Sequence, residues 1–167
     1  MAKKLLIAGS ALALICSCNS MENPLLTESS APFGAPEFDK IKNEHYLPAF
    51  EAGIAEAKAE IDAIVANKEE PTFENTIEAM EVSGQTLNNV AGIFFNLMEA
   101  DTDDEMQQIA ESVSPMLTEY SMYVSLNNDL FQKVKAVYEK RSELGLAQDQ
   151  MTLLEDNYKS FVRGGAN

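Results

Sequence analysis

Hydrophobic residues recur with helical spacing over most of the chain. Between Glu44 and Asn67 they follow one another at alternating steps of three and four residues: Leu47, Phe50, Ile54, Ala57, Ile61 and Ile64. This spacing places the side chains on one face of a helix. Pro48 lies near its start, and a proline inside a helix removes one backbone N–H donor. We therefore expect either that residues 44–47 form a separate turn or that the regular helix begins near Pro48.

A second helix is predicted from Phe73 to Ala100, after a short polar connection that contains Pro71. Its apolar stripe consists of Ile77, Met80, Leu87, Ala91, Phe94 and Met98. Gly84 falls on the same stripe. The missing side chain either permits close approach of a neighbouring helix or is simply tolerated, at a cost of about 1 kcal/mol.

Three further helices are predicted in the second half of the chain. The spacing Thr102-x-x-Glu105 is typical of a capping box and places the start of the third helix at Thr102. Pro115 is expected to kink that helix. A fourth helix follows Asn127 or Asn128 as its cap, and a fifth covers residues 147–162. No sustained strand-like alternation occurs, and the connections are short, so we predict an all-α, antiparallel bundle of about five helices.

The first residues predict an export signal. Lys3 and Lys4 precede an apolar run of 11 residues, Leu5–Ile15, which is shorter than the roughly 20 residues that a membrane-spanning helix needs. The run ends in Ile15-Cys16-Ser17-Cys18, which resembles the bacterial lipobox. We therefore expect a signal peptide at 1–17, lipid modification of Cys18, and an extended tether at 18–37. A plain secretory signal is the alternative.

These assignments predict a location in the bacterial cell envelope. The protein would be bound to the membrane through lipidated Cys18, on the outer membrane and facing the periplasm. Cleavage before Cys18 would remove the two charges of Lys3 and Lys4, changing the formal net charge from −15 to −17. It would also leave no free thiol in the helical part.

Composition excludes several functions. There are 12 Lys and Arg residues against 27 Asp and Glu, which argues against nucleic acid as a partner. A single histidine excludes the HExxH zinc motif, so the chain holds no predicted catalytic residue, metal ligand or cofactor site. The dense acidic stretch Asp101, Asp103, Asp104 and Glu105 does not predict a calcium loop, because Met106 occupies the sixth position, where such a loop needs glycine.

The remaining polar candidates have structural explanations. His45 is a possible general base, but with no serine or cysteine nucleophile to pair with it we interpret it as a surface or capping residue. The acidic stretch after Asp101 is expected to cap the third helix. The acidic residues of the first helix are expected to form its solvated side: Glu51, Glu56, Glu60 and Asp62.

Five segments resemble the N-terminal region of the thimet oligopeptidase family, whose bacterial members include oligopeptidase A and peptidyl-dipeptidase (dipeptidyl carboxypeptidase). The most specific is PTFENTIEA at residues 71–79. The others are FDKIK with EHYLPAFEAG at 38–53, FFNL at 94–97, VSP at 113–115 and FVRGGAN at 161–167. They occur in the family's order, and the peptidyl-dipeptidase branch is the most similar.

The resemblance implies an all-helical zinc peptidase that cleaves short peptides in a deep channel. In the family, zinc is held by the two histidines of HExxH and a distant glutamate, far downstream of the region matched here. None of these positions has a counterpart in this chain, so zinc would belong to the full-length enzyme only. We expect residues 38–167 to be an incomplete N-terminal helical region that forms channel wall and lid and is inactive alone. Its apolar face would be covered by later helices.

A second hypothesis is a stand-alone helical lipoprotein that binds peptides or partner helices through that face. The two hypotheses differ in whether the chain works as part of an enzyme.

Overall fold

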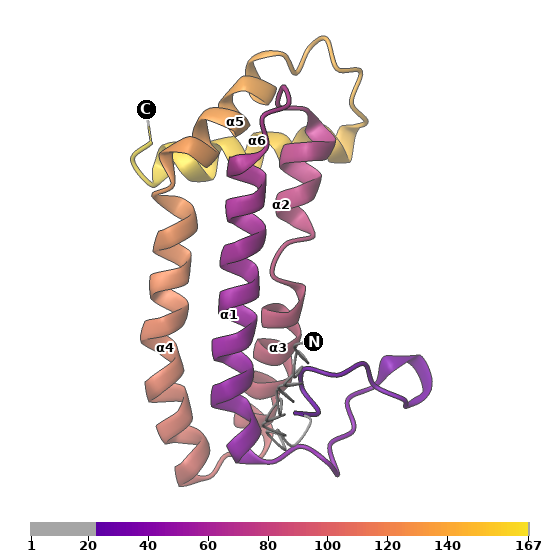
Figure 1. Ribbon diagram of the computed structural model, residues 1–167, viewed down its shortest axis with the longest axis vertical. Coiled ribbons are helices and arrows are strands. Elements are labelled where there is room, and N and C mark those ends of the chain that lie inside the picture. Colours follow the sequence, from indigo (N-terminus) through magenta and orange to yellow (C-terminus); the bar gives the residue numbers. More distant parts are fainter. Residues whose placement is uncertain (1–22, 167) are drawn as a thin grey trace, which may run out of the picture.

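The computed structural model describes residues 23–166, and in this range it contains helices and loops and no strand (Figure 1). The all-α class and the five helices are therefore confirmed. The long helices are α1 (Asn43–Ala66), α3 (Gln85–Ala100), α4 (Asp104–Ser125), α5 (Asn128–Glu139) and α6 (Gln148–Arg163). Three shorter elements accompany them, namely the 3-10 turn η1 (Pro32–Gly34), the π-helical η2 (Phe73–Glu78) and α2 (Ala79–Glu81).

Helix α1 is the central element of the structure. Its first half packs against α3, α4 runs beside it, and α5 and α6 lie across the end of the molecule at which α1 and α4 finish (Figure 1). α1 carries eight buried residues, spread over both its halves. The remaining helices are thus assembled on a common apolar surface.

Two apolar clusters form the core. In the first, Phe94 of α3 packs edge-on against Tyr46 and Phe50 of α1, with ring centroids 4.9 and 5.5 Å away. The second joins the far half of α1 to η2, α5 and α6, and there Phe131 contacts Phe161 at 5.8 Å. Such aromatic pairs contribute about 0.5–1.5 kcal/mol beyond their buried area.

The start of α1 differs from both possibilities predicted from the sequence. The helix begins at Asn43 and continues through Pro48 without interruption. Pro48 removes one hydrogen bond from the helix. Two features offset this loss: His45 Nδ1 accepts the N–H of Lys42 at 3.0 Å, and the side chains of Tyr46 and Phe50 are buried on either side of the proline.

The prediction of one continuous helix from Phe73 to Ala100 is wrong, because the structure divides this range into η2, α2 and α3. Thr72 caps its start by accepting the N–H of Asn75 at 3.1 Å. After η2 and α2 the helix stops at Glu81, and α3 begins only at Gln85. Gly84 lies in the break, in the left-handed region with φ of 71°, where a residue with a side chain is strained. Gly84 is therefore a turn residue, and neither of the two roles predicted for it is found.

The caps of the later helices follow the sequence more closely. Helix α4 is capped by Asp103, whose carboxylate accepts the N–H of Met106 at 2.7 Å, so the predicted cap at Thr102 is wrong by one residue. A carboxylate is favoured there because it also faces the positive end of the helix. α4 continues through Pro115 as one helix. Asn127 caps α5 as predicted, accepting the N–H of Leu130 at 3.0 Å.

Residues 23–42 lie beside the helices before α1 begins (Figure 1). Leu25 is only 8% exposed and belongs to the first apolar cluster. Asn23 Nδ2 donates to the backbone oxygen of His45 at 2.8 Å. The part of the predicted tether that follows Asn23 is therefore attached to the start of α1. Cys18 and the predicted signal at 1–17 lie outside the described residues.

Helices α1 and α3 approach each other closely at Gly53. A Cβ added there would lie 3.0 Å from the Cα of Leu87, so α3 would have to shift. We predict that Gly53→Ala lowers the free energy of unfolding relative to Gly92→Ala by about 1–3 kcal/mol, the usual cost of overpacking. Gly92 is a matched control, because it also lies within a helix and a Cβ there meets no atom within 4 Å.

Both substitutions gain the same helix propensity, so the difference between them isolates the packing cost. Urea unfolding followed by circular dichroism measures it. Equal midpoints for the two variants would show that the approach at Gly53 is not tight.

Candidate functional site

The candidate site is a groove that opens beside the break between α2 and α3. The backbone N–H of Gly84 donates to Glu60 Oε2 of α1 at 2.6 Å. This contact fixes the turn against α1 and leaves Ser83 and Glu81 at the rim of a cavity of about 490 Å³. Ser83 in turn donates its hydroxyl hydrogen to the carbonyl of Met80 at 2.7 Å, which closes the end of α2.

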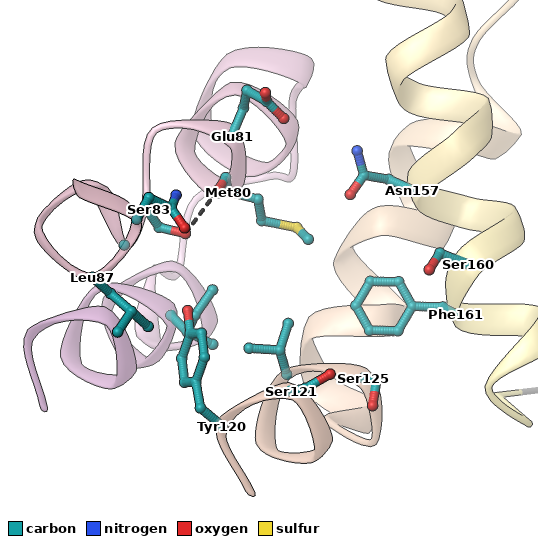
Figure 2. A pocket seen from close by; sticks show the side chains of 14 residues that line it. Met80, Glu81, Ser83, Leu87, Tyr120, Ser121, Ser125, Asn157, Ser160 and Phe161 are labelled. Carbon is teal, nitrogen blue, oxygen red and sulfur yellow. Dashed lines mark hydrogen bonds between the residues drawn. The ribbon is translucent and has the colours of Figure 1, made fainter. Parts of the chain in front are cut away.

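Five parts of the chain line the groove, and one of them is α1, which contributes Ile61. Figure 2 shows the labelled side chains of the other four. Met80 and Leu87 come from the two sides of the break, Tyr120 from α4, and Phe161 from α6. Hydroxyl and amide groups stand among these apolar side chains: Ser83, Asn88, Ser121, Ser125, Asn157 and Ser160. The groove can therefore contact an apolar side chain and at the same time hydrogen-bond the backbone of an extended peptide or the polar side chains of a helix.

The electrostatics of the groove are acidic. Glu81 is the one charged residue in its lining. Burial, and secondarily the negative charge of Glu60, raise the pKa of the Tyr120 hydroxyl above its ordinary value of 10.0. The hydroxyl therefore stays protonated at neutral pH and can donate a hydrogen bond.

Glu60 differs from the other acidic residues of α1. Glu51, Glu56 and Asp62 are exposed, as predicted. Glu60 is half-buried, and the prediction that it lies on the solvated side is wrong because it accepts the hydrogen bond from Gly84. The side chain of Asp62 accepts a hydrogen bond from the hydroxyl of Tyr123.

The other candidates from the sequence are structural. His45 Nδ1 accepts the backbone N–H of Lys42, and the side chain is 13% exposed, which is the capping role expected of it. Asn43 Nδ2 donates to Asp103 Oδ2 at 3.1 Å and to Glu105 Oε2 at 3.0 Å. The Met106 N–H and then Asn43 lower the pKa of Asp103, so this carboxylate stays charged as a helix cap.

Neither a metal site nor a membrane-spanning helix is formed by residues 23–166. Within that range no three His, Cys, Asp or Glu side chains come together as metal ligands. The helices of the same range are too short or too polar to cross a bilayer.

Four large apolar side chains are exposed next to lining residues of the groove. Val82 precedes Ser83, Met122 and Leu126 each follow a lining serine, and Val162 follows Phe161. Isolated exposed apolar residues are ordinary on a protein surface. Here they lie on three of the segments that line the groove, namely the turn after α2, α4 and α6.

Fold and groove together define an all-helical polypeptide with a surface suited to a peptide or a helix. No protein-family model matches the chain. It is 43% identical to the dipeptidyl carboxypeptidase of Escherichia coli (strain K12) over 144 residues, which are 86% of this chain and 21% of that protein. The dipeptidyl carboxypeptidase of Salmonella typhimurium is 42% identical over the same shares of both chains.

Oligopeptidase A of Salmonella typhimurium is 25% identical over 145 residues, 87% of this chain and 21% of that protein. The chain thus spans about a fifth of the length of the curated relatives it matches. These relatives confirm the resemblance carried by the sequence motifs: the chain is homologous to part of the peptidases of the thimet oligopeptidase family.

We predict that Glu60→Gln lowers the pKa of Tyr120 but leaves it above 10.0, because burial is the larger cause and persists. Glutamine can still accept the Gly84 N–H, so the turn is retained. Because the folded-state pKa is raised, this tyrosine's contribution to stability is complete below the unfolded pKa. It is lost as the pH rises through the folded pKa.

NMR titration of the tyrosine ring resonances measures this effect. Tyr46 is the internal control, since burial raises its pKa and no charged group contributes. An unchanged or higher pKa for Tyr120 in Glu60→Gln would show that the carboxylate does not act on this hydroxyl.

Proposed function

We propose that this chain forms the N-terminal helical wall of a zinc peptidase of the peptidyl-dipeptidase type, which releases dipeptides from short peptides. The observation that carries the proposal is the identity of 43% to a dipeptidyl carboxypeptidase over 86% of the chain. The helical structure agrees with the fold that the resemblance implies.

The residues of this chain do not fit a catalytic zinc ion. A zinc peptidase site needs three protein ligands and a residue that activates water. The sequence has one histidine, His45, and its Nδ1 atom is already engaged in capping α1. We therefore derive no catalytic step from this chain, and propose that the zinc ligands and the general base are supplied by a different part of the enzyme.

The proposed role of the helices is to build one side of a channel. The groove offers a mixed apolar and hydrogen-bonding surface, and the exposed residues Val82, Met122, Leu126 and Val162 would be covered by further helices of the enzyme. A wall of rigid helices admits short unfolded peptides and excludes folded proteins.

The groove also supports the second candidate, a helical lipoprotein that binds a peptide or a partner helix without catalysis. The polar lining groups and the acidic Glu81 suit an extended peptide as well as a helix. The two functions differ in one respect: a wall segment acts only together with the zinc-bearing part, whereas a binding protein acts alone.

A chimaera separates the two functions. The homologous 144 residues of the Escherichia coli dipeptidyl carboxypeptidase are replaced by those of this chain. We predict that the chimaera releases dipeptides from a blocked tetrapeptide in a zinc-dependent manner, and that this chain alone releases none. The measurement is chromatography of the released dipeptide.

Two exposed serines of α4 provide matched variants. Ser121 lines the groove and Ser112 does not. Ser121→Trp should lower kcat/KM of the chimaera about tenfold, or about 1.4 kcal/mol of transition-state stabilisation, while Ser112→Trp leaves it unchanged. Zinc-dependent hydrolysis by the chain alone would overturn the proposed inactivity. A folded but inactive chimaera, with peptide binding by the isolated chain, would favour the second function.

We further propose that Cys18 is lipid-modified and that the protein lies on the periplasmic side of the outer membrane. The support is the order of the first residues: Lys3 and Lys4, the apolar run Leu5–Ile15, then Ser17 and Cys18. Acyl chains contribute about 0.8 kcal/mol per buried methylene, so more than one chain gives a stable attachment.

We predict that Cys18→Ser moves the protein from the membrane to the soluble fraction and abolishes incorporation of labelled palmitate. Cys16→Ser, two residues away and within the predicted signal, is the control and should keep both properties. The measurement is fractionation of cells grown with the label. A Cys18→Ser protein that still sediments with membranes contradicts the anchor.

A further inference from the structure

Residues 23–42 combine a fixed attachment to the helices with exposed apolar side chains. Asn23 is held by its bond to the backbone oxygen of His45, and its own side-chain oxygen accepts the N–H of Leu25 at 3.0 Å. Leu25 is 8% exposed and belongs to the first apolar cluster. The segment therefore has a defined position on the helical body from Asn23 onward.

Beyond Leu25, the same segment exposes three large apolar side chains. Leu26 is 41% exposed, Phe38 is 54% exposed, and Phe33 is fully exposed. Phe33 also has a φ of 62°, the one positive φ at a non-glycine residue in the part of the chain that is described. An aromatic residue in this conformation is strained, and its ring contributes no packing to the protein. Both costs point to a contact made outside the chain.

The sequence places this segment next to the proposed lipid anchor. Cys18 and Asn23 are five residues apart, and five residues span at most about 18 Å in any conformation. With Cys18 at the lipid surface, Asn23 cannot lie farther from the bilayer than this, and the start of α1 lies one hydrogen bond away from the side chain of Asn23. If the chain were unattached from Cys18 to Phe38, the helices could lie up to about 70 Å from the lipid surface.

The charge of the segment also suits a lipid surface. Residues 23–42 contain three acidic and two basic residues in a chain of formal net charge −15. Lys40 forms an ion pair with Glu37 at 2.7 Å beside Phe38. The segment is therefore nearly neutral, and anionic lipid repels it only weakly.

We infer that Leu26, Phe33 and Phe38 insert into the lipid interface and hold the N-terminal end of the helical body against the membrane. The inference rests on the proposed lipid modification of Cys18. Aromatic and leucine side chains are the residues that bury in the headgroup boundary, and three of them supplement the acyl chains without any membrane-spanning helix. The start of α1 then faces the bilayer.

The chain contains no tryptophan, so single substitutions give unambiguous fluorescence probes. Phe33→Trp tests the contact, and Leu144→Trp is the control, because Leu144 is 39% exposed in the loop between α5 and α6, which lie at the opposite end of α1 (Figure 1). Each full-length protein is produced in bacterial cells, extracted in detergent and reconstituted into phosphatidylcholine vesicles with brominated acyl chains. Palmitate labelling of the same samples reports on Cys18.

In lipidated protein, we expect the emission of the tryptophan at position 33 to shift to the blue and to be quenched by the brominated lipid. The emission of the tryptophan at position 144 should remain that of a water-exposed ring. A lipidated protein whose position 33 stays unquenched overturns the inference while the anchor stands. If brominated lipid does not quench the tryptophan at position 33 and aqueous iodide does not either, a protein surface covers this position. Absence of palmitate overturns the proposed anchor, and this inference with it.

Discussion

The contact between the carboxylate of Glu60 and the backbone N–H of Gly84 determines how the two halves of the structure meet. It is a charge-assisted hydrogen bond of 2.6 Å from the second half of α1 to the turn that follows α2. Because Gly84 is left-handed, α3 can start in a new direction, and Gly53 lets α3 come into close contact with α1 one turn later. Without the break, α2 and α3 would form one helix and the groove beside Ser83 would not exist. The groove therefore depends on a half-buried carboxylate that is 24 residues away from the turn it binds.

The spacing of apolar residues predicts the limits of a helix where the apolar stripe and the helix end at the same residues. α5 begins at its predicted cap, Asn127, and α6 begins and finishes within one residue of its predicted limits, 147 and 162. The break at Gly84 was missed because Met80 and Leu87 keep helical spacing across it, and spacing alone cannot reveal a positive φ. The consecutive Ser83 and Gly84 were the available signal, since this dipeptide commonly marks a turn. At α1 the error was the opposite one: burial of Tyr46 and Phe50 outweighed the single hydrogen bond lost at Pro48.

The candidate site was less predictable than the fold. Sequence reasoning judged residues by their chemistry, and it correctly assigned His45 to a capping role and the acidic stretch at Asp103 to a helix start. It did not identify Asn157, Ser160 or Ser121, which have no distinctive spacing. They become neighbours only when α4 and α6 are packed beside the break in the second helix (Figure 2). Glu60, whose charge raises the pKa of Tyr120 in the groove, is predicted to lie on the solvated side of α1 because its acidic neighbours Glu56 and Asp62 lie there.

The position of the groove relative to the attached N-terminal segment follows from α1. Asn23 binds the backbone of His45 near the first turn of this helix, whereas Ile61 contributes to the groove near its last turns. Sixteen residues of helix separate these points, or about 24 Å at 1.5 Å per residue. α1 is one uninterrupted helix over this interval and is buried by α3 and α4 on its flanks, so the two sites keep a fixed separation. A body attached to a lipid surface at the start of α1 would therefore present the groove away from the bilayer, where peptides in solution, or the remaining helices of an enzyme, have access to it.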